Sequence, residues 1–520
     1  MKRNDERYAL ISVYDKTGIV ALAKYLHDLN YKIISTGGTA KVLTENNIPV
    51  IPIQNITGNP ESFDGRMKTI SFQIESGILF DRQNPTHIKE AHTLHIKPID
   101  IVVCNLYPFE ETIKNSHTSL ETAIENIDVG GSTMLRAAAK NFQNVLVVTD
   151  PKDYESLKSA LKQKGITQKF RKELAAKAFA LISFYDSQIA AYLNTDLFPG
   201  TLTLPSRKLL DLRYGENPHQ LASVYQRPNT KSFLNALKKN GGLDLSLINV
   251  TDINAGLESV RLFSEPAAVV IKHNTPCGIA LGKTLQEALK RAIEADPQSA
   301  FGGVIVLNKP LDLKTAKVIA SFKTEKKGNI DIVASPSMTD DALELLKKTR
   351  KNMGLYSFGK IHPVPSTMNM KWVDGGFIMQ TADCDIEDGF KDWKCVTKAK
   401  PTKKQLAMMR IGWKFISRMK SNTIVVMDKN IPMTRGIGCG QTSRVGAAHI
   451  ALNQSEKFAK GAILVSDSFF PFDDSVKLAA KYKIAAIVQQ GGSVNDRASI
   501  DAANRSSIPM VFTGRRAFWH

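Results

Sequence analysis

The sequence predicts an α/β protein with more than one domain. The chain has 520 residues, which is longer than a single hydrophobic core usually grows. Short apolar runs alternate with segments of helical periodicity along most of that length, and this alternation predicts βαβ units built on parallel strands. No stretch approaches the run of about eighteen apolar residues that a membrane-spanning helix needs, so we expect no membrane partner.

The N-terminal part of the chain carries the alternation most clearly. Its predicted strands are 8–13, 31–36, 48–53, 99–109 and 144–150, and its predicted helices are 16–30, 39–47, 153–165 and 171–193. Pro199 and Gly200 interrupt the pattern within residues 196–206, and such residues mark loops and linkers. We therefore expect one domain over residues 1–198 and another over residues 199–520.

The C-terminal part repeats the alternation twice, with an irregular stretch between the two sets. The first set has predicted strands at 266–274, 302–308 and 330–337 and helices at 285–296 and 340–351. The second has predicted strands at 422–428, 461–467, 484–490 and 510–513 and helices at 443–452 and 473–482. Two sets of this kind predict two α/β lobes.

The composition narrows the classes of partner. The formal net charge of +19 suggests anionic partners. Two basic runs, 323–329 and 347–352, contain no aromatic residues that could stack on bases, so we expect anionic small molecules rather than nucleic acid. The five cysteines are widely spaced and form no Cys-x-x-Cys pair, which is typical of a reduced, cytoplasmic protein without a zinc site.

Two predicted strand-to-helix turns are rich in glycine and hydroxyl side chains. They lie at 12–18 and 35–39 and would share one edge of the sheet. Backbone N–H groups at a helix N-terminus bind phosphate, although the same residue types also cap ordinary helices. The candidate phosphate ligands are Ser12, Lys16, Thr17, Ser35, Thr36, Gly37 and Thr39.

Three further motifs, 64–69, 105–109 and 124–141, place ionisable side chains beside glycines or at predicted turns. Each side chain taken alone fits an exposed ion pair, but as a group they predict a polar site. The candidates are Arg66, Lys68, Tyr107, Asp128, Arg136 and Lys140.

In the C-terminal domain an apolar run ends in Lys272 and His273, and we expect a turn marked by Pro276 and Gly278 to follow. Open α/β sheets present chemistry at such strand ends, although a solvated strand end has the same pattern. The segments 213–220, 466–474 and 513–520 add polar and aromatic side chains that suit a ligand with a flat ring.

The motifs, taken in order, closely resemble those of the bifunctional purine biosynthesis family that combines AICAR transformylase with IMP cyclohydrolase. The resemblance covers nearly the whole chain. Its carriers are SVYDKTG, STGGT, DGRMKT, NLYPFEETI, IENIDVGGSTMLRAAAKN, RYGENPHQ, IKHNTPCG, SAFGGV, KSNTIV, GIGCGQTSR, SDSFFPFDD and TGRRAFWH.

The resemblance implies a methylglyoxal-synthase-like N-terminal domain and a C-terminal domain of two cytidine-deaminase-like lobes, in a homodimer with transformylase sites shared across the interface. It also implies the reactions. The C-terminal domain moves a formyl group from the co-substrate 10-formyltetrahydrofolate to the 5-amino group of AICAR, giving FAICAR. The N-terminal domain dehydrates FAICAR to IMP, and neither step is expected to need a metal.

For formyl transfer, the resemblance implies that His273 takes a proton from the attacking amine. Lys272 would stabilise the oxyanion or help to protonate the departing folate nitrogen, and Asn422 would hold the formyl group or its developing charge. The implied substrate-binding residues are Arg213, Tyr214 and Asn217 for AICAR, Arg444 for the nucleotide, Phe469 and Asp474 on the folate side, and Arg516 and His520 at the chain end.

For the cyclohydrolase, both reacting groups belong to one molecule, so positioning should supply most of the rate. The resemblance implies that Tyr107 and Lys140 polarise the formyl oxygen and move protons. Asp128 would orient the attacking amide or accept its proton, and Lys68 would support charge. The two glycine-containing turns would hold the ribose phosphate.

The sequence departs from the family pattern at residues 71–76, where Ser71, Phe72, Glu75 and Ser76 stand in place of histidine-containing steps. An active transformylase with a silent or impaired cyclohydrolase is therefore an alternative. A zinc nucleoside deaminase is a rival because Cys277 follows Pro276, but Ala280 replaces the second thiolate. A basic nucleic-acid-binding protein is the rival from another class.

Overall fold

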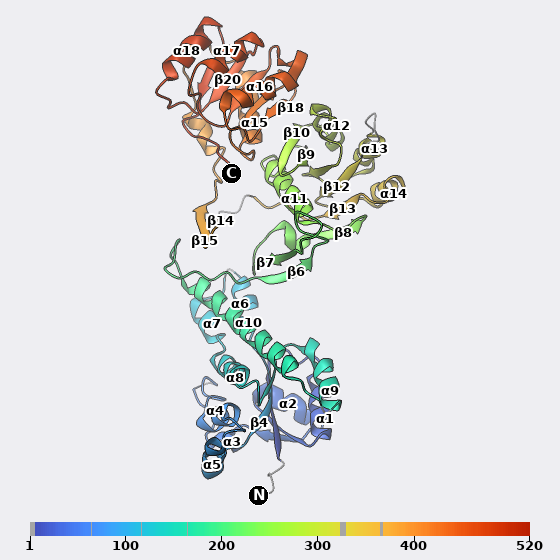
Figure 1. Cartoon of the computed structure of the whole chain (residues 1–520), viewed down its shortest axis with the longest axis vertical. Helices are drawn as coiled ribbons and strands as arrows, with labels where there is room; N and C mark the ends of the chain where they lie inside the picture. Colours follow the sequence, from blue (N-terminus) through green and yellow to red (C-terminus); the bar gives the residue numbers. More distant parts are fainter. Residues whose placement is uncertain (1–5, 64, 116, 164, 323–328, 364–367) are drawn as a thin grey trace. The chain divides into compact units, whose positions relative to one another are not determined.

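The computed structural model describes residues 6–63, 65–115, 117–163, 165–322, 329–363 and 368–520. The chain divides into two compact units (Figure 1), which are Met1–Arg207 with Arg227–Asn229 (unit 1) and Lys208–Gln226 with Thr230–His520 (unit 2). The domain boundary predicted between residues 198 and 199 stays a prediction. Most of the basic run 323–329 lies outside the described residues.

Unit 1 is built on a five-stranded sheet with the order β3-β2-β1-β4-β5. All four pairings are parallel, which confirms the predicted parallel sheet. Parallel strands covered on both faces are apolar along their length, and the two central strands are buried in this way. The strands are β1 Arg7–Val13, β2 Tyr31–Ser35, β3 Val50–Pro52, β4 Ile99–Asn105 and β5 Leu146–Val148.

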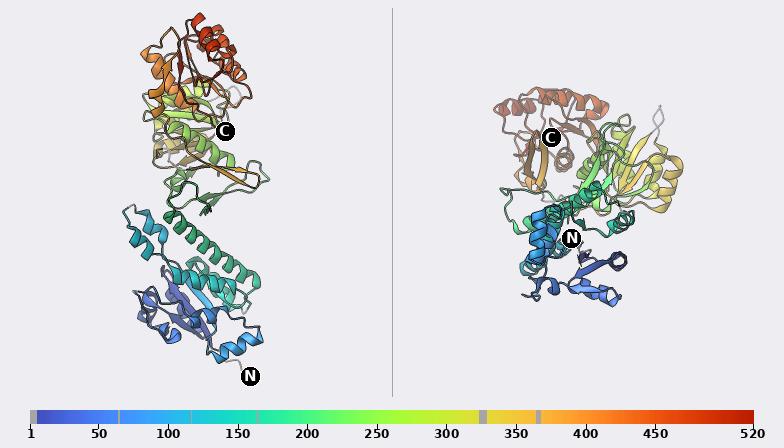
Figure 2. Two further views of the ribbon diagram at one scale, coloured as in Figure 1. Left: turned by 90° about the vertical axis from the view of Figure 1, so that its left-hand side faces the viewer. Right: turned by 60° about the horizontal axis from the view of Figure 1, so that its bottom comes forward.

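The helices of unit 1 follow the strands and cover the sheet. The longest is α10, which can be followed as one long ribbon in Figure 2. It packs against α8, and Ala178 and Ile182 are among its buried residues. The helices are α1 Ile19–Asp28, α2 Gly37–Glu45, α3 Gln54–Thr57, α4 Phe72–Leu79, α5 Pro85–Thr93, α6 Phe109–Lys114, α7 Leu120–Glu125, α8 Val129–Lys140, α9 Tyr154–Lys162 and α10 Gln168–Leu193, with the 3-10 turn η1 Pro151–Asp153.

The first lobe of unit 2 has a mixed six-stranded sheet with the order β10-β9-β11-β12-β13-β8. The strands are β8 Lys238–Gly241, β9 Ala267–Lys272, β10 Thr275–Leu281, β11 Gly303–Leu307, β12 Ile330–Ser335 and β13 Gly354–Ser357. The helices are α11 Leu247–Val260, α12 Leu285–Ala295, α13 Leu313–Ser321 and α14 Asp340–Thr349. A small sheet of β6 Arg207–Asp211 and β7 Ser223–Gln226 and the 3-10 turn η2 Phe233–Ala236 precede them.

The second lobe has another mixed six-stranded sheet with the order β16-β21-β20-β19-β17-β18. The strands are β16 Lys394–Cys395, β17 Ile424–Met427, β18 Thr434–Gly438, β19 Ile463–Ser466, β20 Ala486–Gln489 and β21 Met510–Phe512. The helices are α15 Lys403–Ile416, α16 Arg444–Ser455, α17 Asp474–Lys481 and α18 Asp496–Arg505, with η4 Glu456–Ala459. The hairpin β14 Met368–Val373 and β15 Gly376–Thr381, followed by η3 Asp388–Asp392, precedes this sheet.

The two lobes share one topology. The order β10-β9-β11-β12-β13 of the first lobe matches β18-β17-β19-β20-β21 of the second, with two antiparallel pairings followed by two parallel ones in each case. A helical glycine lets the preceding helix approach the sheet in both. A Cβ on Gly256 would lie 2.4 Å from a methyl of Val306, and a Cβ on Gly412 would lie 2.7 Å from a methyl of Val465.

The lobes are also joined. Residues of both lobes contribute to one hydrophobic cluster, and Ala280 of β10 forms an isolated antiparallel bridge to Met433. The predicted pair of α/β lobes is therefore confirmed, and the mixed sheets are what the sequence did not predict. No helix within the described ranges is long and apolar enough to cross a membrane.

The turn after β9 differs from the expected one. Strand β10 already begins at Thr275, so the turn is made by His273 and Asn274, with φ of 54° and 61°. Left-handed φ at both central residues is what a tight two-residue hairpin turn requires. Gly278 belongs to β10. A Cβ at this position would lie 2.0 Å from the carbonyl oxygen of Ala292 in α12, so the close packing of the helix on the strand requires a glycine here.

Candidate active sites

Unit 1 contains a cavity of about 790 Å³ at the carboxyl edge of its sheet. The turns after β1, β2 and β4, residues 61–70 and the amino end of α8 line it. The candidate residues brought together here are Ser12, Lys16, Thr36, Gly37, Thr39, Arg66, Lys68, Tyr107 and Asp128. This edge is where open α/β sheets bind ligands.

Two lysines converge on the amino end of α2. A Cβ on Gly37 would lie 2.6 Å from Lys68 Nζ, and a Cβ on Gly38 would lie 3.8 Å from Lys16 Nζ. Lys16 Nζ also donates to the carbonyl oxygen of Tyr14 at 3.2 Å, and Lys68 Nζ lies 2.9 Å from Glu61 Oε1. Two ammonium groups at a helix N-terminus form a site for a dianion such as phosphate.

Asp128 is the N-cap of α8. Its Oδ1 accepts a hydrogen bond from Gly131 N at 2.7 Å, and its backbone N–H donates to the Tyr185 hydroxyl at 2.8 Å. Burial raises the pKa of Asp128, and hydrogen bonds from the backbone N–H groups of Gly131 and Tyr107 offset part of that rise. A carboxyl group that gains a proton more readily suits proton transfer.

Tyr107 faces the same cavity with half of its surface exposed, and its ring packs edge-on against Tyr14 with a centroid distance of 5.4 Å. Asn105, which the sequence did not single out, also lines the cavity. Its Oδ1 accepts from the backbone N–H groups of Tyr14 at 2.6 Å and Asp15 at 2.9 Å. Asn105 could have been identified from its position at the end of β4. Its side chain holds the loop that carries Lys16.

Four candidates of unit 1, Thr17, Ser35, Arg136 and Lys140, do not line this cavity. The Ser35 hydroxyl is buried and donates to Ile11 O at 2.6 Å, and Thr17 is exposed on the α1 side of its turn. Lys140 ends α8, the helix that Asp128 caps. A rise of about 1.5 Å for each of twelve residues separates Asp128 from Lys140 by about 18 Å. The two residues belong to one sequence motif but lie at opposite ends of the helix.

Lys140 instead lines a separate groove of about 840 Å³ between α4, α8 and α10, together with Glu75 and Arg136. Glu75 is one of the residues that depart from the family pattern. Its Oε1 is buried without a hydrogen-bond partner within the described part of the chain, and burial raises its pKa to about 7. Of the four altered residues, Glu75 lines this groove, and none of them lines the cavity of unit 1 described above.

In unit 2, the hairpin turn presents Lys272 and His273. Lys272 Nζ donates to Phe301 O at 2.9 Å, and the turn is held by Asp252 of α11, whose Oδ1 accepts from Asn274 N at 2.6 Å. Burial raises the pKa of Asp252, and the nearby His273 opposes that rise. The hairpin turn at His273 is therefore held on one side by the contact of Lys272 with Phe301 and on the other by the contact of Asn274 with Asp252 of α11.

Arg213 and Tyr214 follow β6, and backbone hydrogen bonds from Arg213 N to Leu245 O and from Leu247 N to Tyr214 O place them beside the amino end of α11. The guanidinium of Arg213 stacks over the Tyr214 ring at 4.8 Å and donates to its hydroxyl at 3.1 Å. Asp331 of β12, which the sequence did not single out, is close to both Lys272 and Arg213, whose charges oppose the rise of its pKa by burial. Asn217 is used locally, because its backbone N–H and its Nδ2 both donate to Gln220 Oε1.

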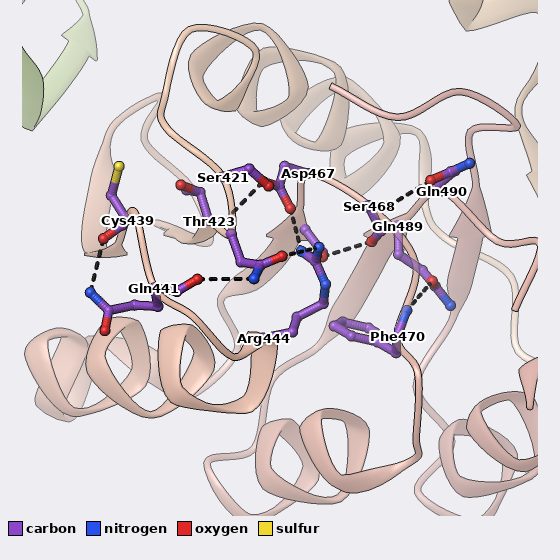
Figure 3. A network of polar contacts seen from close by, with 12 residues as sticks. Ser421, Thr423, Cys439, Gln441, Arg444, Asp467, Ser468, Phe470, Gln489 and Gln490 are labelled. Carbon is purple, nitrogen blue, oxygen red and sulfur yellow. Dashed lines mark hydrogen bonds and ion pairs between the residues drawn. The ribbon is translucent and has the colours of Figure 1, made fainter. Parts of the chain in front are cut away.

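In the second lobe, Asn422 and Arg444 belong to one polar network (Figure 3). Arg444 begins α16, and its side chain is 7% exposed and ion-paired with Asp467. Arg444 Nη2 donates to Asn422 Oδ1 at 2.7 Å, and Asn422 Nδ2 donates to Gln441 O at 2.9 Å. The Arg444 guanidinium therefore binds side chains of the protein itself, Asp467 and Asn422.

The chain end is tied to this network. Ser421 N donates to Trp519 O at 2.9 Å, and Ala517 N donates to Asp467 O at 2.8 Å. Arg516 stacks over the Phe518 ring at 4.6 Å, and the Phe518 and His520 rings lie 5.5 Å apart. Termini usually fray, but these contacts hold Arg516 and His520 beside Asn422. Phe469 lies on the loop that joins β19 to α17, and Asp474 is the first residue of α17.

The two halves of the site meet at Cys439. Its thiol donates to Lys420 O at 3.3 Å. Burial raises the pKa of Cys439, and the side chains of Thr423, next to Asn422, and Thr275, next to the hairpin turn, lie close enough to offset part of the rise. Lys272, His273 and Asn422 therefore belong to one region of unit 2. No group of three or more metal-ligating side chains occurs within the described residues.

Comparison with known families gives two matches. Residues 138–454 match the model of the AICARFT/IMPCHase bienzyme family, and residues 18–133 match the model of the MGS-like domain. The second match covers most of the turns that line the cavity of unit 1, and the first covers the hairpin of Lys272 and His273 together with Asn422 and Arg444.

Curated relatives match over nearly their full length. The bifunctional purine biosynthesis protein PurH of Thermoanaerobacter sp. strain X514 is 44% identical over 98% of this chain and 99% of its own. Proteins of the same name from Halalkalibacterium halodurans, 43% identical over 99% of this chain and 100% of the relative, and Clostridium botulinum strain 657, 44% identical over 98% and 99%, are similarly close.

Proposed function

The chain belongs to the AICARFT/IMPCHase bienzyme family, and from this membership we propose how its two sites divide the work of AICAR formyl transfer and IMP cyclohydrolysis. The protein is a bifunctional enzyme of purine biosynthesis that formylates AICAR and closes the product FAICAR to IMP. The observation that carries the division is that each compact unit holds its own polar site, with the phosphate-type cavity in unit 1 and the Lys272–His273 hairpin in unit 2.

For formyl transfer, the acceptor amine of AICAR is conjugated with its ring and is a poor nucleophile. We assign His273 as the base that removes one amine proton, and Lys272 as the cation that stabilises the oxyanion of the tetrahedral intermediate. The Asn422 Nδ2 hydrogens point at Gln441 O and Thr442 O, and Oδ1 accepts from Arg444 Nη2 on one lone pair, which leaves its second lone pair to accept from a substrate. Asn422 therefore accepts from the second amine N–H rather than donating to the oxyanion.

AICAR binding is assigned to the first lobe and the chain end. Arg213, Tyr214 and Asp331 lie near Lys272, and they suit a polar ring with a charged tail. Phe469, Asp474, Arg516 and His520 of the second lobe remain proposed contacts of the folate side and the pocket rim. Asn217 shapes the loop 213–220 through Gln220.

For ring closure, the lysines at the amino end of α2 hold the phosphate of FAICAR, and Asp128 manages the proton of the attacking amide. Tyr107 lines the same cavity as Asp128, and we assign it to polarise the formyl oxygen. Both reacting groups sit in one molecule, so alignment in the cavity supplies most of the acceleration. Lys140 lies outside this cavity, and its catalytic role stays a prediction.

Formyl-folate is the co-substrate of the family, and we propose 10-formyltetrahydrofolate as its form. We also propose a cytoplasmic homodimer in which a second copy completes each transformylase site. The net charge of +19 fits two anionic substrates. The alternative of an impaired cyclohydrolase gains no support from the relatives, which carry the name of the bifunctional protein over nearly their full length, and none of the four altered residues lines the cavity of unit 1.

The test is a coupled assay with the full-length protein, AICAR and 10-formyltetrahydrofolate. Tetrahydrofolate release is followed by absorbance, and FAICAR and IMP are separated by chromatography. We expect release of tetrahydrofolate with IMP as the end product. Accumulation of FAICAR without IMP would contradict the cyclohydrolase assignment, and no tetrahydrofolate release would contradict the roles of Lys272 and His273.

A further inference from the structure

Asp467 is a buried carboxylate next to the transformylase site with no part in the chemistry assigned so far. It follows β19 and its side chain is 0% exposed. Its Oδ2 accepts from the Ser421 hydroxyl at 2.6 Å and from Thr423 N at 3.0 Å, and its Oδ1 pairs with Arg444. The carboxylate thus contacts both neighbours of Asn422 in the chain (Figure 3).

Arg444 carries the effect of Asp467 to the Asn422 side chain. Its Nη1 bonds to Asp467 and to Ser466 Oγ at 3.1 Å, while Nη2 bonds to Asn422 Oδ1 at 2.7 Å. A buried guanidinium needs a counter-charge and planar partners. Asp467 supplies the charge, so the direction of Nη2 depends on Asp467.

The Asn422 amide is then fixed from two sides. Nδ2 has two hydrogens, and they point at Gln441 O at 2.9 Å and Thr442 O at 3.4 Å. Oδ1 receives Arg444 on one lone pair and keeps the other. Rotation of the amide by 180° would place its N–H groups against the guanidinium, so the network allows a single orientation.

We infer that Asp467 is a positioning residue for formyl transfer, which acts through Arg444 to hold Asn422 with its carbonyl oxygen toward the attacking amine. The inference rests on the proposed function of this site. In the step it serves, the amine nitrogen bonds to the formyl carbon, one amine proton passes to His273, the bond from that carbon to the folate nitrogen breaks, and that nitrogen gains a proton. The other amine hydrogen stays on the product and is the one that Asn422 orients.

The test begins with Asp467→Asn in the full-length protein, assayed for formyl transfer with AICAR and 10-formyltetrahydrofolate. The substitution keeps the size of the side chain and removes its charge. We expect kcat for formyl transfer to fall by about 10²-fold, the loss that a misplacement of a positioned group by about 1 Å can cause, with both KM values within about threefold. Cyclohydrolase activity on FAICAR, which belongs to unit 1, serves as the internal control and should not change.

A matched control is Ser468→Ala, because Ser468 is buried on the same loop and its hydroxyl bonds to Gln490 Oε1 at 2.6 Å, away from Asn422. We expect its kcat to stay within about twofold of the wild type. A similar loss in Ser468→Ala and Asp467→Asn would mean that the loop tolerates no polar change, and it would overturn the inference.

A double-mutant cycle separates positioning from general stability. In the Asn422→Ala background, measured at high enzyme concentration, Asp467→Asn should have little further effect on kcat, because there is no amide left to orient. An equal loss in both backgrounds overturns the inference. If Asp467→Asn fails to fold, Arg444→Lys takes its place in the cycle, since lysine keeps the charge but cannot reach Asp467, Ser466 and Asn422 together.

The wild-type assay keeps the two ideas apart. If the wild type releases no tetrahydrofolate, the proposed function fails and the inference fails with it. If the wild type is active and Asp467→Asn retains its kcat, only the inference is wrong.

Discussion

The ammonium group of Lys68 lies directly over Gly37, so that a Cβ added to the glycine would be 2.6 Å from Nζ. The two residues come from different motifs and meet at the amino end of α2. Gly37 also has φ of 52°, a backbone conformation that side chains other than glycine rarely adopt. One glycine therefore serves both the turn and the position of the cation.

We expect Gly37→Ala to lower cyclohydrolase kcat/KM by about 10- to 100-fold, because the methyl group displaces the Lys68 ammonium group, to which we assign binding of the substrate phosphate. Formyl transfer should be unchanged. The measurement is steady-state kinetics of both reactions on the same preparation. Gly58→Ala is the matched control, since Gly58 has φ of 72° in the same unit and nothing lies within 4 Å of the added Cβ. Equal losses in the two variants would show that backbone strain, rather than Lys68, is responsible.

Asp128→Asn should lower cyclohydrolase kcat by about 10²- to 10⁴-fold, the range expected when a proton-transferring group is removed. An asparagine still caps α8, so the melting temperature should stay close to that of the wild type. Chromatography of the coupled reaction should show FAICAR in place of IMP. Normal IMP formation by this variant would exclude Asp128 from proton transfer.

His273→Asn should lower formyl transfer by at least about 10²-fold and leave cyclohydrolase activity intact. Asparagine accepts the left-handed φ of 54° at this turn, so the hairpin is retained and the loss reports the imidazole. His449→Asn, on α16 of the same unit, is the control and should be near wild type in both reactions. Retained tetrahydrofolate release in His273→Asn would refute the base assignment.

Glu75 makes stability depend on pH. Its folded pKa is about 7, above the ordinary value of about 4.3, so the unfolded chain loses this proton first as pH rises. The contribution of Glu75 to stability is therefore full below about pH 4.3 and is lost by about pH 7. Glu75→Gln cannot ionise, so it should melt at a higher temperature than the wild type at pH 8 and show a smaller difference at pH 5.

The difference in melting temperature between variant and wild type is measured by thermal unfolding of unit 1 at the two pH values. Glu90→Gln is the control, because Glu90 is exposed on α5. The control should show the same difference from the wild type at both values. A pH-independent difference for Glu75→Gln would mean that the carboxyl group is already ionised in the folded protein.

The parallel sheet of unit 1 could be predicted because its buried strands are continuous apolar runs with helical segments between them. Strand β10 could not. Proline and glycine are typical of loops, but Pro276 and Gly278 lie in a strand. The tight turn is already completed by His273 and Asn274, and α12 packs so closely on the strand that only glycine fits at position 278. That packing involves residues distant in sequence.

The candidate site shows the same limit. Motifs identified Asn422 and Arg444, but the partner that decides what Arg444 can do, Asp467, lies beyond the motif that contains Arg444. Likewise Asp128 and Lys140 share one motif, and the rise of α8 separates them. A sequence motif identifies the residues. Which of them contact the substrate, and which hold other side chains in position, depends on the fold.

The shared strand order of the two lobes of unit 2 has an evolutionary meaning. A chain that carries one topology twice, down to the helical glycines at 256 and 412, has the form left by duplication and fusion of a shorter gene. The two equivalent hairpins have since diverged. The first exposes Lys272 and His273, whereas the second, after β17, is closed by a pair between Asp428 and Arg435 with a 2.7 Å contact. A repeated fold of this kind offers two equivalent hairpins for a reactive side chain, and in this chain the first carries Lys272 and His273.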